Sequence, residues 1–68
     1  MDILIDDFGM SLGKKSERLI IKKKGEILQE TPFFNISQIT ISSSGVSLST
    51  DVIRECMERG ININFLTY

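Results

Sequence analysis

The sequence predicts an α+β domain: a β-rich, sandwich-like fold of about six to seven strands, with one helix near its C-terminal end. Several short segments alternate apolar and polar residues with the period of two that is typical of strands. The segment ERLIIKKKGEILQE has two strand-like halves around a Lys-Gly turn, which indicates a β-hairpin. The segment STDVIRECMERG carries the start and stop signals of a helix.

The first half of the chain is predicted to consist of strands and turns. DILIDDFGMSLG fits two short strands around an Asp-Phe-Gly turn, because Asp and Gly supply turn geometry. We expect residues 13–16 to form a short loop before the hairpin. Within the hairpin, residues 19–21 are the core of a buried strand, Lys24 and Gly25 are the turn, and residues 27–28 belong to the returning strand.

The middle of the chain is predicted to hold one clear strand. Pro32 ends the preceding strand, since proline cannot donate to a β-ladder. The alternation in FFNISQITIS indicates a strand from about residue 37 to residue 42. We expect Phe33 and Phe34, which precede this strand, to fill the core. SSSG then predicts a turn, and VSLS predicts a short strand.

The helix has well-defined ends. Ser49 or Thr50 is the N-cap, with a hydroxyl that can accept a backbone N–H. Gly60 ends the helix, because it can adopt a left-handed conformation. The face that we expect to be buried consists of Val52, Ile53, Cys56 and Met57. On this basis Ile53→Asp should unfold the domain. ININFL follows as a strand, and two strands around a helix favour a right-handed crossover.

The length and composition limit the possible folds and sites. A chain of 68 residues forms one small domain of marginal stability unless something assists it. The single cysteine excludes an intramolecular disulfide, and the absence of histidine argues against a compact zinc site and against the usual general base. We therefore expect packing against another subunit or domain. The lone cysteine and the lack of a signal peptide favour a cytoplasmic location.

The basic residues are concentrated in one segment, although the net charge is −1. Six of the eight Lys and Arg residues are Lys14, Lys15, Arg18, Lys22, Lys23 and Lys24. One interpretation is that they solvate an exposed hairpin and protect an edge strand from aggregation. The other is that they form a surface that contacts phosphate groups. The sequence alone leaves both open.

Catalytic motifs are not evident. GMSLGKKS is one residue short of the P-loop spacing and precedes a strand rather than a helix. The serines have no histidine or lysine partner at a recognisable spacing. The N-terminal aspartates are interpreted as a charged turn rather than a metal site, and Cys56 as a small core residue.

The order of these segments resembles a known family. An acidic-aromatic-Gly turn is followed by ERLIIKKKGEILQETPFF, ISQITI, VSLSTDVIRECMERGI and INFL. Together they resemble the N-terminal domain of CRISPR-associated endonuclease one, the integrase subunit of spacer acquisition in antiviral defence. The resemblance covers essentially the whole chain. No single motif carries it, but five motifs in the correct order do.

The resemblance implies a role in assembly. Residues 1–68 would be the β-rich dimerisation domain, and a helical domain that is absent from this chain would carry the Mg²⁺ or Mn²⁺ ligands. The intact protein would be a metal-dependent endonuclease that inserts spacers into the repeat array. No catalytic or metal-binding residue can be transferred to this chain. The implied partners are a second copy, a small ferredoxin-like adaptation protein and duplex DNA.

The resemblance also favours DNA contact by particular residues. The candidates are Lys14, Lys15, Arg18, Lys22, Lys23, Lys24 and Phe8. Phe8 would stack on a base where a duplex frays, and the alternative is a phenylalanine buried in its turn. A different function remains open at this point: a stand-alone β-rich dimerisation or interaction module with no nucleic-acid role. Salt-dependent binding to DNA would separate the two.

Overall fold

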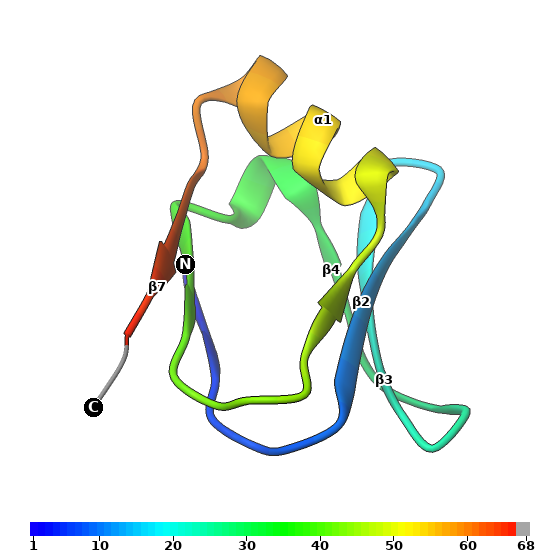
Figure 1. Ribbon diagram of the computed structural model, residues 1–68. Coiled ribbons are helices and arrows are strands. Elements are labelled where there is room, and N and C mark those ends of the chain that lie inside the picture. Colours follow the sequence, from blue (N-terminus) through cyan, green and yellow to red (C-terminus); the bar gives the residue numbers. More distant parts are fainter. Residues whose placement is uncertain (67–68) are drawn as a thin grey trace.

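The computed structural model describes residues 1–66. Within them, the chain forms two β-sheets, a 3₁₀ turn and one α-helix (Figure 1). The elements are β1 (Asp2–Ile5), β2 (Met10–Lys15), β3 (Arg18–Lys23), β4 (Glu26–Pro32), η1 (Phe33–Asn35), β5 (Gln38–Ile41), β6 (Ser47–Leu48), α1 (Thr50–Arg59) and β7 (Asn62–Phe65). The predicted α+β class, with a single helix near the C-terminal end, is confirmed.

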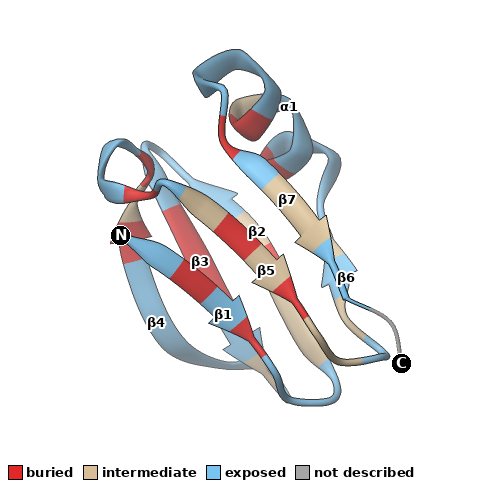
Figure 2. Cartoon of the chain, turned by 90° about the vertical axis from the view of Figure 1, so that its left-hand side faces the viewer, coloured by how far each residue is buried: buried red, intermediate tan, exposed pale blue. Residues whose placement is uncertain are grey.

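The two sheets face each other, and α1 lies across one end of the space between them (Figures 1 and 2). The four-stranded sheet has the order β4-β3-β2-β6, with β2, β3 and β4 antiparallel and β6 parallel to β2. The three-stranded sheet has the order β1-β5-β7, and both of its pairings are parallel. Each sheet therefore buries one face and leaves the other free.

The core lies between the two inner faces. Alternate residues of each strand point inward, as the pleat of a strand requires. The three-stranded sheet contributes Ile3, Ile5, Ile39 and Ile41, and the four-stranded sheet contributes Leu12, Leu19 and Ile21. Phe33 of η1 and Val52 and Cys56 of α1 complete this cluster. Figure 2 shows the buried positions alternating along β1 and β5.

The ends of α1 agree with the sequence. Ser49 is the N-cap, and its hydroxyl oxygen accepts a hydrogen bond from the Val52 N–H at 3.2 Å. Gly60 follows the helix with φ 70°, a left-handed conformation that costs glycine little. The helix has ten residues, and no helix within residues 1–66 is long and apolar enough to span a membrane.

The predicted buried face of α1 is only half right. Val52 and Cys56 are buried, whereas Ile53 is 40% exposed and Met57 is 77% exposed. The helix contacts β2 and β7. Ile53 and Met57 each follow a buried residue by one position, which places their side chains about 100° further around the helix and away from the core. The expectation that Ile53→Asp buries a charge is therefore wrong, and Val52 is the residue that occupies such a position.

The topology differs from the sequence-based expectation in the first strands. β1 and β2 do not form a hairpin: β1 pairs with β5, and β2 lies in the opposite sheet. The Asp-Phe-Gly turn therefore connects the two sheets. Residues 13–16 are not a loop either, because β2 continues through Gly13 and ends at Lys15. Ser16, with φ 56°, makes the turn that follows.

The strands around the helix also lie apart. β6 pairs with β2, and β7 pairs with β5, so that α1 connects two sheets rather than two neighbouring strands of one sheet. Periodicity identified both strands but could not assign either to a sheet. The crossover expected between them is therefore absent from residues 1–66.

Other predictions are confirmed. β3 and β4 form the hairpin, and Lys24 and Gly25 make its turn with φ 51° and 80°. Two positive φ angles are what a tight hairpin turn of right-handed twist requires. β4 ends at Pro32 as expected. Of the two phenylalanines that follow, Phe33 fills the core and Phe34 is 74% exposed.

Candidate nucleic-acid interface

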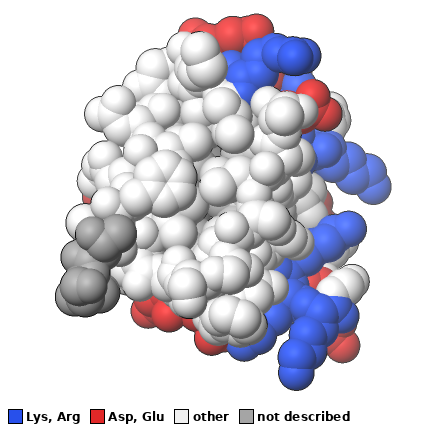
Figure 3. Space-filling view, in the orientation of Figure 1, with Lys and Arg blue, Asp and Glu red and all other residues white. Residues whose placement is uncertain are grey.

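The basic segment follows the β2–β3 hairpin, where strand alternation divides it into two groups. Lys15, Arg18 and Lys22 alternate with the inward-facing Leu12, Leu19 and Ile21, so they belong to the outer face. Lys14 and Lys23 lie on the inner side at the two ends of the hairpin, and Lys24 lies in the β3–β4 turn. Figure 3 shows the Lys and Arg side chains along one side of the molecule, beside a large uncharged surface.

The two inner-side lysines are held by carboxylates. Lys14 Nζ lies 3.0 Å from Glu55 Oε1, and this hydrogen bond raises the pKa of Lys14. Lys23 Nζ donates to Asp7 Oδ2 at 2.7 Å, and this hydrogen bond holds the pKa of Asp7 below its usual value. Both lysines therefore join structural elements and are less available to an external anion.

Glu55 is the centre of the larger of these ion networks. Arg59 Nε donates to Glu55 Oε2 at 2.5 Å, as the i,i+4 spacing predicts, and Arg59 Nη2 pairs with Glu17. The hydrogen bonds from Arg59 and then from Lys14 lower the pKa of Glu55. The Arg59 guanidinium also lies 6.0 Å from the centre of the Phe33 ring. The network ties α1 to the β2–β3 turn and to η1.

The three outer-face cations have no such partners. Lys15, Arg18 and Lys22 are exposed, and none of them takes part in the ion pairs found within residues 1–66. Lys15 and Arg18 are also cross-strand partners. Like charges directly opposite each other destabilise a sheet, so folding alone gives no reason for this arrangement. An external polyanion would remove the repulsion.

Phe8 lies in the β1–β2 turn and is 67% exposed, so the interpretation of Phe8 as a buried turn residue is wrong. Its backbone N–H donates to Asp7 Oδ1 at 2.9 Å. One side of the ring rests on Gly45, where an added Cβ would lie 2.5 Å from Phe8 Cε2. A ring supported on one side and open on the other can stack on a flat partner.

Sequence reasoning missed part of the outer face. Gly13 lies in the middle of β2, directly opposite Ile20, and leaves a hollow there. A glycine within a strand is a known sign of close approach by a ligand or another backbone, so the signal was present. The support that Gly45 gives to Phe8 had no such signal, because it joins two distant turns.

The described residues contain no metal centre. Within residues 1–66, no three potential His, Cys, Asp or Glu ligands come together. Cys56 is buried, and burial raises the pKa of its thiol, which makes it a poor nucleophile. We therefore derive no catalytic step from these residues.

Fold and surface together define a small two-sheet domain whose cations on one outer face have no ion-pair partner among residues 1–66. The family model of the CRISPR associated protein Cas1 matches residues 3–68. The chain therefore belongs to the Cas1 family, and the resemblance seen in the sequence is confirmed.

Two curated relatives are CRISPR-associated endonucleases named Cas1 1. The protein of Pyrobaculum aerophilum is 34% identical over 65 residues, which are 96% of this chain and 21% of the relative. The protein of Francisella tularensis subsp. novicida is 32% identical over 66 residues, which are 97% of this chain and 20% of the relative. The chain thus spans about a fifth of the length of these relatives.

Solved structures share the fold. A chain of a Cas6-RT-Cas1–Cas2 complex superposes with a TM-score of 0.91 at 12% identity, over 97% of this chain and 7% of that chain. A casposase bound to an integration product superposes with a TM-score of 0.73 at 22% identity, over 96% of this chain and 21% of that chain. At these identities the likeness concerns the fold.

Proposed function

We propose that this domain is the dimerisation and DNA-docking part of a CRISPR adaptation integrase. The observation that supports docking most directly is a group of three cations on the outer face of the four-stranded sheet that form no ion pair with any described residue: Lys15, Arg18 and Lys22. Lys24 extends this group at the neighbouring turn. A surface that reads phosphate rather than bases suits a protein that must accept DNA of any sequence.

Phe8 adds a second kind of contact. Its exposed ring rests on Gly45, so it lies where the β1–β2 turn meets the turn before β6. Stacking on a terminal base pair or an unpaired base is tolerant of sequence, because every base has a π-face. The phosphate contacts and the stacking of the ring would together hold duplex DNA through interactions that do not depend on its sequence.

Dimerisation is the other half of the proposal. β4 is an edge strand, and Ile27 and Leu28 on it are 53% and 54% exposed. An exposed apolar edge offers unpaired backbone groups to a second copy. A small, disulfide-free core also gains stability from such a partner. A ferredoxin-like adaptation protein would then contact the assembled pair.

DNA cleavage and joining are assigned to the rest of a longer protein. The relatives are named endonucleases and are about five times as long as this chain. The Mg²⁺ or Mn²⁺ on which that chemistry depends would be held by the helical domain expected from the resemblance. The role of the residues described above is to bind and position the substrate.

The docking proposal is tested by salt-dependent DNA binding. Each phosphate contact contributes about 0.9 to the slope of log K against log salt concentration on duplex DNA. The triple variant Lys15→Gln, Arg18→Gln, Lys22→Gln should therefore lower the slope by about 2 to 3, measured by fluorescence anisotropy. Arg54→Gln is the matched control, because Arg54 lies on α1, away from the sheet. If the triple variant and this control behave alike, the outer face does not dock DNA.

The dimer proposal has its own test. The molar mass should fall on dilution from that of a dimer to that of a monomer, and the thermal midpoint should fall with it. Leu28→Lys, on the exposed edge, should shift the midpoint of dissociation to higher concentration. If the protein is a monomer at every concentration, the dimerisation proposal is contradicted and the DNA-docking proposal is unaffected. Absent DNA binding with an intact dimer would instead favour an interaction module with no nucleic-acid role.

A further inference from the structure

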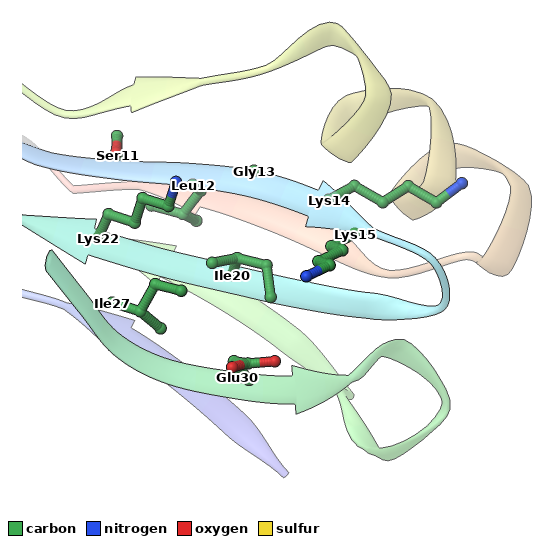
Figure 4. Close-up of a pocket in the computed structure, with 9 residues that line it drawn as sticks. All are labelled: Ser11, Leu12, Gly13, Lys14, Lys15, Ile20, Lys22, Ile27 and Glu30. Atoms are coloured by element: carbon green, nitrogen blue, oxygen red, sulfur yellow. The ribbon is translucent and has the colours of Figure 1, made fainter. Parts of the chain in front are cut away.

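The outer face of the four-stranded sheet contains a hollow of about 430 Å³ (Figure 4). It lies where Gly13 of β2 faces Ile20 of β3. A Cβ built on Gly13 would meet nothing within 4 Å, so the missing side chain accounts for the open space. The lining residues used below are Gly13, Lys15, Ile20, Lys22, Ile27 and Glu30.

The hollow has an apolar floor. Ile20 is only 5% exposed although it belongs to the outward face of the sheet, and Ile27 on β4 lies beside it. Figure 4 shows Lys15 and Lys22 on either side of Ile20. The aliphatic parts of these lysines can cover the isoleucine while their ammonium groups remain in water. The half-exposed Ile27 and the aliphatic parts of the two lysines therefore form an apolar surface over Ile20, with a positive charge at each end.

The spacing of the two lysines is set by the strands. Lys15 is the cross-strand partner of Arg18, and Lys22 lies four residues further along β3. Their Cα atoms are thus separated by roughly 13 Å along the sheet, at about 3.3 Å per residue. Two flexible side chains over that span can reach anionic groups on both sides of a ligand that covers Ile20.

We propose that this hollow receives one unpaired nucleotide of a DNA strand. The sugar and base would lie against Ile27 and the aliphatic parts of Lys15 and Lys22, above Ile20, and the flanking phosphates would meet the two ammonium groups. The volume falls within the range of about 300–1,000 Å³ that is usual for small-ligand sites. This inference rests on the proposed docking function and adds to it a shaped site, which an evenly charged surface would lack.

Glu30 gives the site a preference among bases. It is the cross-strand partner of Ile20 and lines the hollow, where its carboxylate can only accept hydrogen bonds. Cytosine and adenine carry exocyclic amino groups that donate, whereas the corresponding position of thymine is a carbonyl oxygen. The hollow should therefore hold cytosine or adenine more tightly than thymine, and Glu30→Gln should reduce that preference.

Gly13→Leu tests the shape of the site without altering its charge. Gly13 does not adopt a left-handed conformation, so leucine should fit the backbone and fill the hollow. The variant should bind a ten-residue oligo-dC about tenfold more weakly at fixed salt, a loss of about 1.4 kcal/mol, with an unchanged salt slope. Gly13→Ala is the matched smaller substitution, and it should weaken binding of oligo-dC less than Gly13→Leu does. In the wild type, oligo-dC should shift the amide resonances of Gly13 and Ile20, a readout that does not depend on a variant.

The outcomes separate this inference from the docking proposal. If Gly13→Leu binds normally while the triple lysine and arginine variant does not, docking stands and the nucleotide site is refuted. If the wild type itself does not bind DNA, and neither variant differs from it, both proposals are refuted. If Gly13→Leu abolishes binding of free dCMP but not of oligo-dC, the hollow accepts free nucleotides and its role in holding a DNA strand is refuted.

Discussion

The two sheets have similar inner faces and very different outer faces. Both inner faces are built from isoleucine and leucine. The outer face of the β1-β5-β7 sheet has one charged residue, Asp2, on its edge strand. Elsewhere on this face, Asn64 Nδ2 donates to Gln38 Oε1 at 3.1 Å and to Thr40 Oγ1 at 3.4 Å. Its polar side chains thus satisfy one another. The β4-β3-β2-β6 sheet instead presents cations that lack partners within residues 1–66.

This difference separates folding from function. The shared inner faces supply the apolar burial that stabilises the domain. An outer face contributes little to that burial, so its composition can follow other demands. The amide and hydroxyl groups of one sheet form hydrogen bonds with one another and need no external partner. In the other sheet, Lys15 and Arg18 lie opposite each other and their charges repel. This contrast supports the proposal that the four-stranded sheet, rather than the other sheet, provides the binding surface.

The largest effect is expected where α1 joins the two sheets. Val52→Asp would place a charge at a fully buried position and should lower the free energy of unfolding by about 3–5 kcal/mol. Amide resonances of both sheets should be lost together, measured by NMR and by denaturant titration. Ile53→Asp is the control, since Ile53 is 40% exposed, and it should cost about 0.5 kcal/mol or less. If one sheet survives in Val52→Asp, the two sheets are independent and share no core.

An intermediate effect is expected at the turn that supports Phe8. Gly45→Ala combines a left-handed backbone, φ 70°, with a Cβ 2.5 Å from the Phe8 ring. Gly25→Ala has the same backbone problem, φ 80°, but open space around it. The left-handed backbone alone costs alanine about 1–2 kcal/mol. Gly45→Ala should therefore lower the thermal midpoint more than Gly25→Ala does. Equal losses would mean that the ring moves aside freely and is not held for stacking.

The smallest effect is expected at Glu55. The hydrogen bonds from Arg59 and then from Lys14 hold the folded-state pKa of Glu55 below that of a free glutamate. Its ion pairs therefore stabilise the domain above the unfolded-state pKa, and this contribution is lost as pH falls through the folded-state pKa. Glu55→Gln should lower Tm slightly at pH 7, and the difference from the wild type should shrink on acidification. The variant should also bind DNA slightly more tightly, because Lys14 is released. A difference in Tm that does not change with pH would refute the electrostatic role.

The sequence predicted the elements better than their arrangement. Ser49, Gly60 and the Lys24-Gly25 turn were readable because each acts through local backbone geometry. The pairing of β1 with β5 was not readable, since parallel pairing joins segments that are far apart and leaves no turn signature. The same limit applies to the site: the lysine cluster was visible, but its division into paired and unpaired groups depends on Glu55 and Asp7.

The parallel sheet has a consequence for the order of folding. The Met1 amino group donates to Ser37 Oγ at 3.0 Å across 36 residues, and the sheet is complete only when β7 pairs with β5. The β2–β3–β4 meander closes through short turns and can form while the remaining residues are still being synthesised. We expect a ribosome-bound chain to display its lysine-bearing face before it has a complete core. For that interval β3 would lie beside exposed isoleucines, which makes the nascent hairpin a natural substrate for chaperones.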